Sequence, residues 1–246
     1  MARGFLRSLQ ASAPETEVPG PGLLPTPRRP KPCLFTPTQI TALLAGAQAS
    51  GPRGSLRPAT FSTLIGLLAS TGLRVGEALR LPIDHVHLDL DPPQLHILET
   101  QCHQSRLVPL HPSTAECLRH YQAQRARLHY DGLSEAFFVS ERGQPLQHRA
   151  LHDWFVRRCQ RLAIAPTHGG RAPCLTSFRH TFAVTRMQPW YQQGLDVQAS
   201  LPHLSVYLGH VHPQESYWYL TAVPELLSAA AHRCETFAQL GGTSHA

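Results

Sequence analysis

Residues 71–81, TGLRVGEALRL, begin a helix that carries a positive and a negative charge on one face. The Thr-Gly pair at its start is typical of a break between two helices, and Val75 and Leu79 then recur at helical spacing. Arg74 and Glu77 are three residues apart, which places their side chains on the same face. This spacing allows the two side chains to form a simple ion pair on the helix surface.

The chain after residue 35 is predicted to be helical apart from one small sheet. Thr36-Pro37 is an N-cap followed by a first-turn proline, and a second helix is predicted near 58–70. Between residues 84 and 110 the apolar residues form short runs, QLHILE and RLVPL, separated by polar turns, as in an antiparallel sheet. The predicted fold class is therefore mainly α with a small antiparallel β-sheet (α+β).

Further helices are predicted in the second half of the chain. Ser113 and Glu116 have the spacing of a capping box and would open the next helix. The others are expected near 147–163, from Thr176, up to Gly209, over 213–221 and from Pro224. Pro189 lies inside one of these patterns, so the helix around it is expected to end near Gln188.

The first 35 residues differ in composition from the rest. Residues 2–10, ARGFLRSLQ, form a short amphipathic pattern, and eight prolines follow between residues 13 and 37. Such a density of proline forbids helix and predicts an extended linker. The predicted organisation is a short helix and linker over 1–35, one large domain over 36–237 and a disordered tail over 238–246.

Composition narrows the range of functions. The chain has 246 residues and a net charge of +6, which favours a polyanionic partner. Its six cysteines include no C-x-x-C pair, which argues against a disulfide framework and a cysteine zinc site. The sequence contains neither a secretory signal nor a run of about 20 apolar residues, so an intracellular protein without a membrane partner is expected.

Four short segments, taken together, give the strongest indication of function. They are TGLRVGEALRL with Arg74, TSFRHTFAV with Arg179, YLGH with His210 and ESYWYL with Tyr219. Their order and spacing resemble the tyrosine recombinase (phage integrase) family, in which the nucleophilic tyrosine follows the histidine by nine residues, as Tyr219 follows His210. The resemblance covers roughly 36–235 and implies the fold of the family's catalytic domain.

The resemblance implies a reaction that uses neither a metal nor a cofactor. The implied partner is double-stranded DNA, on which several copies of the chain, or the chain and a related recombinase, would assemble. Arg74 and Arg179 would stabilise charge on the phosphate, Tyr219 would attack it, and His210 would assist by hydrogen bonding or proton transfer. Glu77 resembles the acidic partner of the family's first arginine. Contacts to DNA are expected from Arg74, Arg106, Arg179 and His180.

The sequence departs from the family pattern at two catalytic positions. The family places a general-acid lysine in the turn of the small sheet, whereas residues 100–106 read TQCHQSR, with Gln101 and Gln104 in the lysine positions. His103 lies in the same turn and is a candidate substitute. Thr176 replaces the histidine that begins the family's H-x-x-R motif, and a hydroxyl cannot shuttle a proton as an imidazole does. Losing one general acid–base group costs about 10²- to 10⁴-fold in rate.

Three hypotheses follow from the sequence. The first is an active or weakened recombinase that cuts and rejoins DNA through Tyr219, in the cytoplasm and associated with the nucleoid. The second is a DNA-binding relative without activity, which occupies recombination sites or pairs with an active partner. It is favoured by the two substitutions and by a short N-terminus that resembles only the last helix and linker of the family's core-binding domain. The third, a metal-dependent hydrolase, depends on the 16 histidines and on pairs such as His85-x-His87 and His210-x-His212, which have no Asp or Cys ligands nearby in a recognised zinc pattern.

Overall fold

The computed structural model describes residues 2–20, 31–52, 54–98, 105–166, 171–210 and 214–222. Contacts divide the chain into two compact units, residues 1–30 and 31–246. The first unit contains the predicted short helix, α1 (Ala2–Gln10), and the chain then turns back so that Gln10 Nε2 donates to the carbonyl of Thr16 at 2.9 Å. The described part of the proline-rich segment contains no helix, as predicted, and residues 21–30 lie outside the described residues.

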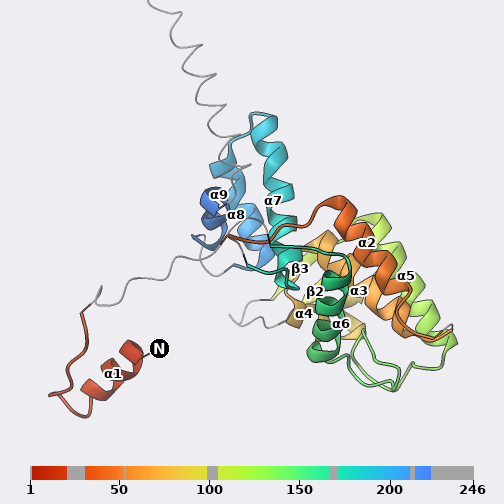
Figure 1. Ribbon diagram of the computed structural model, residues 1–246, viewed down its shortest axis with the longest axis horizontal. Helices are drawn as coiled ribbons and strands as arrows, with labels where there is room; N and C mark the ends of the chain where they lie inside the picture. Colours follow the sequence, from red (N-terminus) through yellow and green to blue (C-terminus); the bar gives the residue numbers. More distant parts are fainter. Residues whose placement is uncertain are drawn as a thin grey trace, which may run out of the picture. The chain divides into compact units, whose positions relative to one another are not determined.

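The second unit is mainly helical with one small sheet, which confirms the predicted fold class (Figure 1). Its helices are α2 (Pro37–Gln48), α3 (Arg57–Thr71), α4 (Val75–Leu79), α5 (Pro112–Arg127), α6 (His148–Arg161), α7 (Thr176–Gln192), α8 (Val197–Leu208) and α9 (Gln214–Ala222). A 3-10 turn, Ile83–His85, leads into strands β1 (Val86–His87), β2 (Gln94–Ile97) and β3 (Arg106–Pro109). The strands pair antiparallel in the order β1-β2-β3.

The start of α2 follows the sequence prediction, whereas the start of α5 does not. Thr36 caps α2 through a reciprocal pair of hydrogen bonds with Gln39, and Pro37 occupies the first turn. The predicted capping box of Ser113 and Glu116 is wrong, because α5 already begins at Pro112. The cap is His111, whose Nδ1 accepts from the backbone N–H of Ser113 at 3.3 Å.

Helix α7 continues through Pro189 to Gln192, so the predicted end near Gln188 is wrong. A proline removes one backbone donor from a helix, and near the C-terminal end this loss concerns a single turn. Trp190 and Tyr191, the next two residues, pack against the apolar cluster shared by α7, α8 and α9. Burial of these aromatic rings offsets the lost hydrogen bond and carries the helix past the proline.

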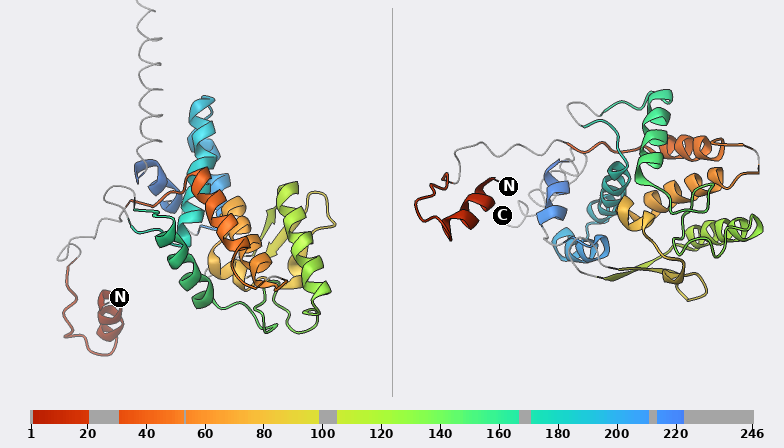
Figure 2. Two further views of the ribbon diagram at one scale, coloured as in Figure 1. Left: turned by 45° about the vertical axis from the view of Figure 1, so that its right-hand side comes forward. Right: turned by 90° about the horizontal axis from the view of Figure 1, so that it is seen from below.

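The core has two apolar clusters that meet along α7. The larger one surrounds α3, which packs against α2, α5 and α7. The smaller one lies between α7, α8 and α9 and includes Phe182, Met187, Leu204, Leu208 and Tyr219. The right-hand view of Figure 2 shows α7 between α3 on one side and α8 and α9 on the other. Helix α7 therefore joins the helical core to the C-terminal helices.

Residues 31–35 belong to this second unit. Cys33 and Phe35 are buried, the Phe35 ring lies 4.8 Å from that of Phe178 on α7, and the Phe35 N–H donates to Thr181 Oγ1 at 2.9 Å. The predicted boundary between 35 and 36 stays a prediction. No helix among the described residues is long and apolar enough to cross a membrane.

Candidate active site

The carboxylate of Glu77 holds two arginines at the point where α4 begins beside β3. Arg74 donates to it through its backbone N–H and through Nη1, each at 3.0 Å. Arg106, 29 residues away, donates through Nη1 at 3.1 Å and Nη2 at 2.8 Å. The Glu77 side chain is only 2% exposed. The alternative of a simple surface ion pair is therefore wrong, because this carboxylate is buried and shared.

The arginines also set the charge state of Glu77. Burial by itself would raise the pKa of this carboxyl group, but hydrogen bonds and charge from Arg106, together with Arg74, hold the pKa below its ordinary value of 4.5. Glu77 is therefore ionised at neutral pH and acts as a fixed anion between two guanidinium groups.

Three arginines converge on the C-terminal end of α8 and donate to three consecutive carbonyl groups. Arg106 Nε donates to the carbonyl of residue 207 at 2.9 Å, Arg179 Nη2 to that of residue 208 at 2.7 Å, and Arg74 Nη2 to that of Gly209 at 2.9 Å. The helix ends at Gly209, as predicted, and this glycine takes the left-handed conformation with φ 68°. The negative end of the helix dipole and the Glu77 carboxylate thus gather three positive groups in one place.

Of the three arginines that meet at the end of α8, Arg179 is the most buried. It lies on α7 among buried residues, and its Nη1 donates to the carbonyl of Gly72 at 2.9 Å. Burial, followed by the charge of Arg74, lowers the pKa of Arg179 from 12.5 to about 10, while Tyr219 and Glu77 act in the opposite direction. Arg179 still carries its charge at neutral pH, and it lies close enough to Arg74 and Tyr219 to interact with both.

His210 directly follows the glycine that ends α8. Its Nδ1 lies 2.7 Å from Ser216 Oγ and its Nε2 lies 3.8 Å from Glu215 Oε2, so residues of α9 fix the imidazole ring. Its ring is stacked on that of Tyr219 at 6.4 Å and 21°. Ser216 was not predicted as a site residue; its position three residues before Tyr219, on the same face of α9, was the available signal.

Tyr219 is buried between two histidines. It is 2% exposed and belongs to the apolar cluster of α7, α8 and α9. Its hydroxyl lies 2.9 Å from His180 Nδ1, and the two rings meet edge to face at 5.6 Å. Trp218 covers the same pair, with its ring 5.5 Å from His180.

The residues predicted from sequence divide into three groups. Arg74, Glu77, Arg179, His210 and Tyr219 come together around the end of α8, with Arg106 and His180 beside them. Thr176 is exposed at the first position of α7, one helical turn before His180. Gln101, His103 and Gln104 lie outside the described residues.

Arg106, which was also expected to contact DNA, uses all three nitrogens of its guanidinium group in hydrogen bonds within the protein. The Arg106 side chain is 9% exposed, and its Nε, Nη1 and Nη2 all donate to protein groups. Its predicted contact with DNA stays a prediction, and the geometry gives it a part in holding Glu77 and the end of α8.

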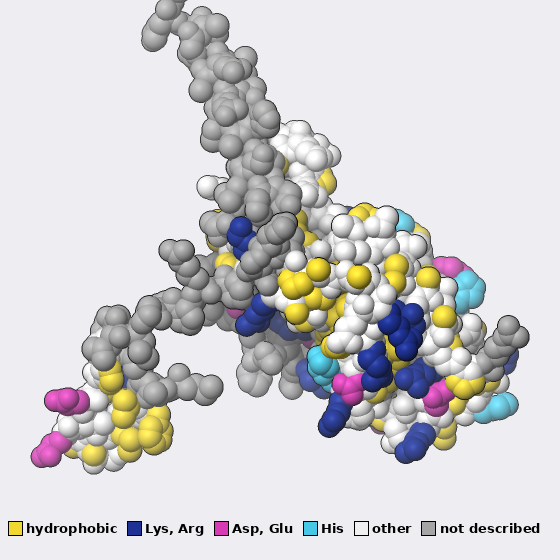
Figure 3. All heavy atoms as spheres, in the orientation of Figure 1, with side chains coloured by type: hydrophobic (Ala, Val, Ile, Leu, Met, Phe, Trp, Pro, Cys, Tyr) yellow, Lys and Arg dark blue, Asp and Glu magenta, His cyan; other side chains and the backbone are white. Residues whose placement is uncertain are grey.

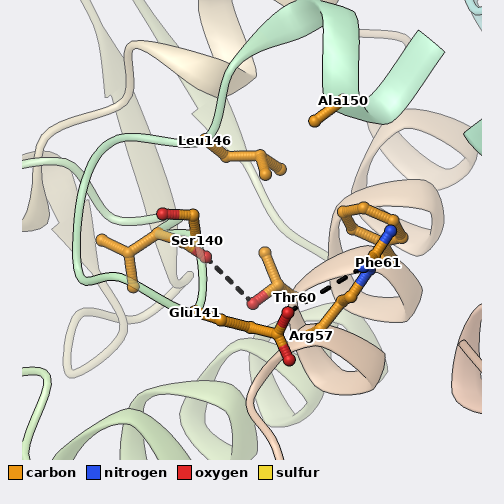
Figure 4. A pocket seen from close by; sticks show the side chains of 8 residues that line it. Arg57, Thr60, Phe61, Ser140, Glu141, Leu146 and Ala150 are labelled. Atoms are coloured by element: carbon orange, nitrogen blue, oxygen red, sulfur yellow. Dashed lines mark hydrogen bonds and ion pairs between the residues drawn. The ribbon is translucent and has the colours of Figure 1, made fainter. Parts of the chain in front are cut away.

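A separate small cavity of about 140 Å³ lies between α3 and the segment that leads into α6 (Figure 4). Arg57 and Glu141 form a partly exposed ion pair of 3.9 Å at one side, and Thr60 Oγ1 donates to the carbonyl of Val139. Apolar side chains such as Leu146 line the rest. The cavity does not include the arginines, histidines or tyrosine gathered at the end of α8.

The chain belongs to the phage integrase family, whose sequence pattern it matches over residues 34–225. It is 38% identical to a protein of Sinorhizobium fredii named as an integrase/recombinase, y4rB, over 95% of this chain and 75% of that protein. It is 29% identical to tyrosine recombinase XerD of Lacticaseibacillus casei over 80% of this chain and 64% of that protein.

The fold is also that of solved recombinases. The crystal structure of the XerH site-specific recombinase, a post-cleavage complex with a palindromic difH substrate, superposes with a TM-score of 0.62 at 21% identity. The match covers 83% of this chain and 54% of the XerH chain, so this chain spans about half the length of that recombinase. The recombinase fold expected from the four sequence segments is confirmed.

Proposed function

We propose that this chain cleaves and rejoins DNA strands as a site-specific recombinase, through a covalent bond between Tyr219 and a 3′ phosphate. One observation carries the proposal: two arginines, a histidine and the tyrosine of four separate sequence segments converge on the C-terminal end of α8. Membership of the phage integrase family supports the same reaction class.

Each of these side chains has a part in displacing a DNA hydroxyl from phosphorus. Arg74, 26% exposed, is the guanidinium group that incoming phosphate meets first, and Arg179 supplies a second positive charge behind it. Tyr219 attacks phosphorus and forms a phosphotyrosyl ester that keeps the energy of the bond for rejoining. His210 donates a hydrogen bond to a non-bridging oxygen.

The proposed reaction requires that the side chains packed around the Tyr219 hydroxyl open locally when DNA binds. Tyr219 is 2% exposed and its ring packs in the apolar cluster of α7, α8 and α9, so a phosphate reaches its hydroxyl only after local displacement. Burial of Tyr219 then serves as a resting state that protects the nucleophile in the absence of DNA.

The proposed partner is double-stranded DNA. Figure 3 shows a group of Lys and Arg side chains on the face of the molecule that includes α6, and Arg149, Arg157 and Arg161 of this helix are exposed. A two-fold symmetric DNA site would bring two copies of the chain, or the chain and a related recombinase, onto one duplex. Such a protein works where the chromosome is, in the cytoplasm and associated with the nucleoid.

A selection for covalent attachment tests the proposal and does not require the sequence of the DNA site in advance. The protein is incubated with a pool of nicked suicide duplexes with randomised arms, and DNA that stays attached in SDS is amplified and sequenced. We expect enriched duplexes with the wild-type chain and no attachment with Tyr219→Phe. Tyr217→Phe, two residues away on the same helix and exposed, is the matched control and should retain attachment.

A second candidate function, DNA binding without cleavage, is favoured by two features of the sequence. Thr176 replaces the expected histidine, and Lys31, far from the turn of the sheet in sequence, is the chain's only lysine. DNA binding without any covalent attachment, with wild type and Tyr219→Phe indistinguishable, would replace the first proposal with this one.

A further inference from the structure

We propose that His180 is the general base that takes the proton of Tyr219 during strand cleavage, in place of the histidine that Thr176 has replaced. The inference rests on the proposed function and assigns a proton acceptor to it. Its basis is a single contact, the 2.9 Å distance between His180 Nδ1 and the Tyr219 hydroxyl oxygen. This is within the hydrogen-bond reach that a base requires.

The position of His180 on α7 explains how it can take over this part. Thr176 and His180 are four residues apart, so they lie one turn apart on the same face of the helix. Thr176 is exposed at the start of the helix, whereas His180 lies deeper, against Tyr219 and Trp218. A basic group thus contacts the nucleophile from a position on α7 one turn after Thr176.

The other histidine of the site is oriented differently. The ring of His210 is nearly parallel to that of Tyr219, with an interplanar angle of 21° and the ring centroids 6.4 Å apart. Its Nδ1 is engaged by Ser216 Oγ at 2.7 Å and its Nε2 lies beside Glu215. The edge-to-face arrangement of His180 instead points Nδ1 at the phenolic oxygen.

The proton balance of the proposed step is simple. Neutral His180, with its proton on Nε2, accepts the phenolic proton at Nδ1 while the Tyr219 oxygen forms a bond to phosphorus. The bond between phosphorus and the 5′ oxygen breaks, and that oxygen leaves with the electron pair and takes a proton from water. In rejoining, the 5′ hydroxyl gives its proton back to the solvent as its oxygen forms a bond to phosphorus, the bond between phosphorus and the Tyr219 oxygen breaks, and that oxygen recovers its proton from His180.

Two DNA substrates distinguish the loss of a base that acts on Tyr219 from the loss of an acid that protonates the leaving 5′ oxygen. In one suicide duplex, chosen from those that the selection enriches, the 5′ bridging oxygen at the cleavage site is replaced by sulfur, which leaves as a thiolate and needs no acid. Adduct formation is timed with both duplexes for wild type, His180→Ala and His180→Asn. Asparagine places an amide oxygen near the position of Nδ1 and can accept the hydrogen bond, but it cannot carry the proton away.

We expect His180→Ala and His180→Asn to form adduct about 10²- to 10⁴-fold more slowly than wild type on both duplexes. His203→Asn, an exposed histidine on α8, is the control and should keep the wild-type rate. Wild-type rates in His180→Asn, or recovery of His180→Ala on the sulfur duplex, would overturn the assignment of the base alone. No adduct from the wild-type chain on either duplex would overturn the recombinase function as well.

Discussion

Glu77 is the residue on which the arrangement of positive charge depends. It is a buried anion that receives donors from Arg74 and Arg106, and both arginines also donate to the end of α8. Removing the charge at residue 77 would leave two guanidinium groups close together without a counter-ion. Losing the counter-ion of buried charges lowers the free energy of unfolding far more than losing one at the surface, because buried charges are poorly screened.

Glu77→Gln is therefore expected to lower the free energy of unfolding by about 3 kcal/mol, measured by urea denaturation at neutral pH. The control is Glu116→Gln on α5, whose ion pair with Arg119 is 3.3 Å long but 56% and 44% exposed. That change should cost no more than about 1 kcal/mol. Equal effects of the two substitutions would contradict the part given to Glu77.

The same substitution should change how stability responds to acid. The pKa of Glu77 is lower in the folded chain than its ordinary value of 4.5, so the folded chain binds fewer protons at this site than the unfolded chain. The contribution of Glu77 is complete above that ordinary value and is lost as the pH falls through the lower pKa of the folded state. Unfolding measured at several acidic pH values should show this loss in wild type and not in Glu77→Gln.

At the scale of residues, sequence spacing predicts what is local and misses what folding brings together. The contact between Arg74 and Glu77 was predictable because residues three apart lie on the same face of a helix, and the structure confirms it. The Arg106–Glu77 contact joins β3 to α4, and spacing cannot predict a pair that depends on how a strand packs against a helix. The contact of His180 with Tyr219 depends in the same way on the packing of α9 against α7.

At the scale of elements, the C-terminal end of α8 is the feature that orders the site. Its last carbonyls accept from three arginines that come from β3, α7 and the start of α4. Gly209 allows this because it takes the left-handed conformation and leaves room for Arg106. A methyl group at residue 209 would lie 2.7 Å from Arg106 Nη1, which is closer than atoms can approach.

Gly209→Ala is expected to be more destabilising than the conformational strain alone explains. The control is Gly132→Ala, where φ is 78° and a methyl group would meet nothing within 4 Å, so only the strain of about 1 kcal/mol remains. Displacement of Arg106 from its hydrogen bonds should add at least about 1 kcal/mol at residue 209. Equal unfolding free energies for the two variants would show that Arg106 does not need the space beside Gly209.

The elements themselves were largely predictable because their signals are local. The cap at Thr36, the helix end at Gly209 and the switch to short strands between 84 and 110 each depend on a few neighbouring residues, and the structure confirms them. The prediction failed at Pro189, where the two aromatic residues that follow, Trp190 and Tyr191, are partly buried against the apolar cluster of α7, α8 and α9. Tertiary packing outweighs local preference at such positions, and sequence periodicity does not measure it.

At the scale of the whole molecule, the site is a product of the fold and not of one segment. Its groups come from α4, β3, α7, α9 and the residues that follow α8, which are far apart in the sequence. Unfolding separates these groups, so the positive charges come together only while the chain is folded. The order of the four segments predicted which residues would converge, because it resembles a known fold; composition and periodicity alone could not.

The positive charge on the outer surface is expected to determine how DNA affinity depends on salt. Arg157 and Arg161 are exposed and lie four residues apart on one face of α6. Each phosphate contact that is lost should reduce the slope of log affinity against log salt by about 0.9. The double variant Arg157→Gln with Arg161→Gln should therefore reduce the slope by up to about 1.8, measured by fluorescence anisotropy on a labelled duplex.

The control must remove positive charge elsewhere, because net charge alone also weakens attraction to DNA. Arg119 and Arg127 lie on α5, on the opposite side of α3 from α6 in the right-hand view of Figure 2. The double variant Arg119→Gln with Arg127→Gln makes the same change in net charge, and its slope should stay close to that of wild type. If the two double variants lower the slope equally, attraction to DNA comes from the overall charge of the chain, and α6 is not the surface that the phosphates contact.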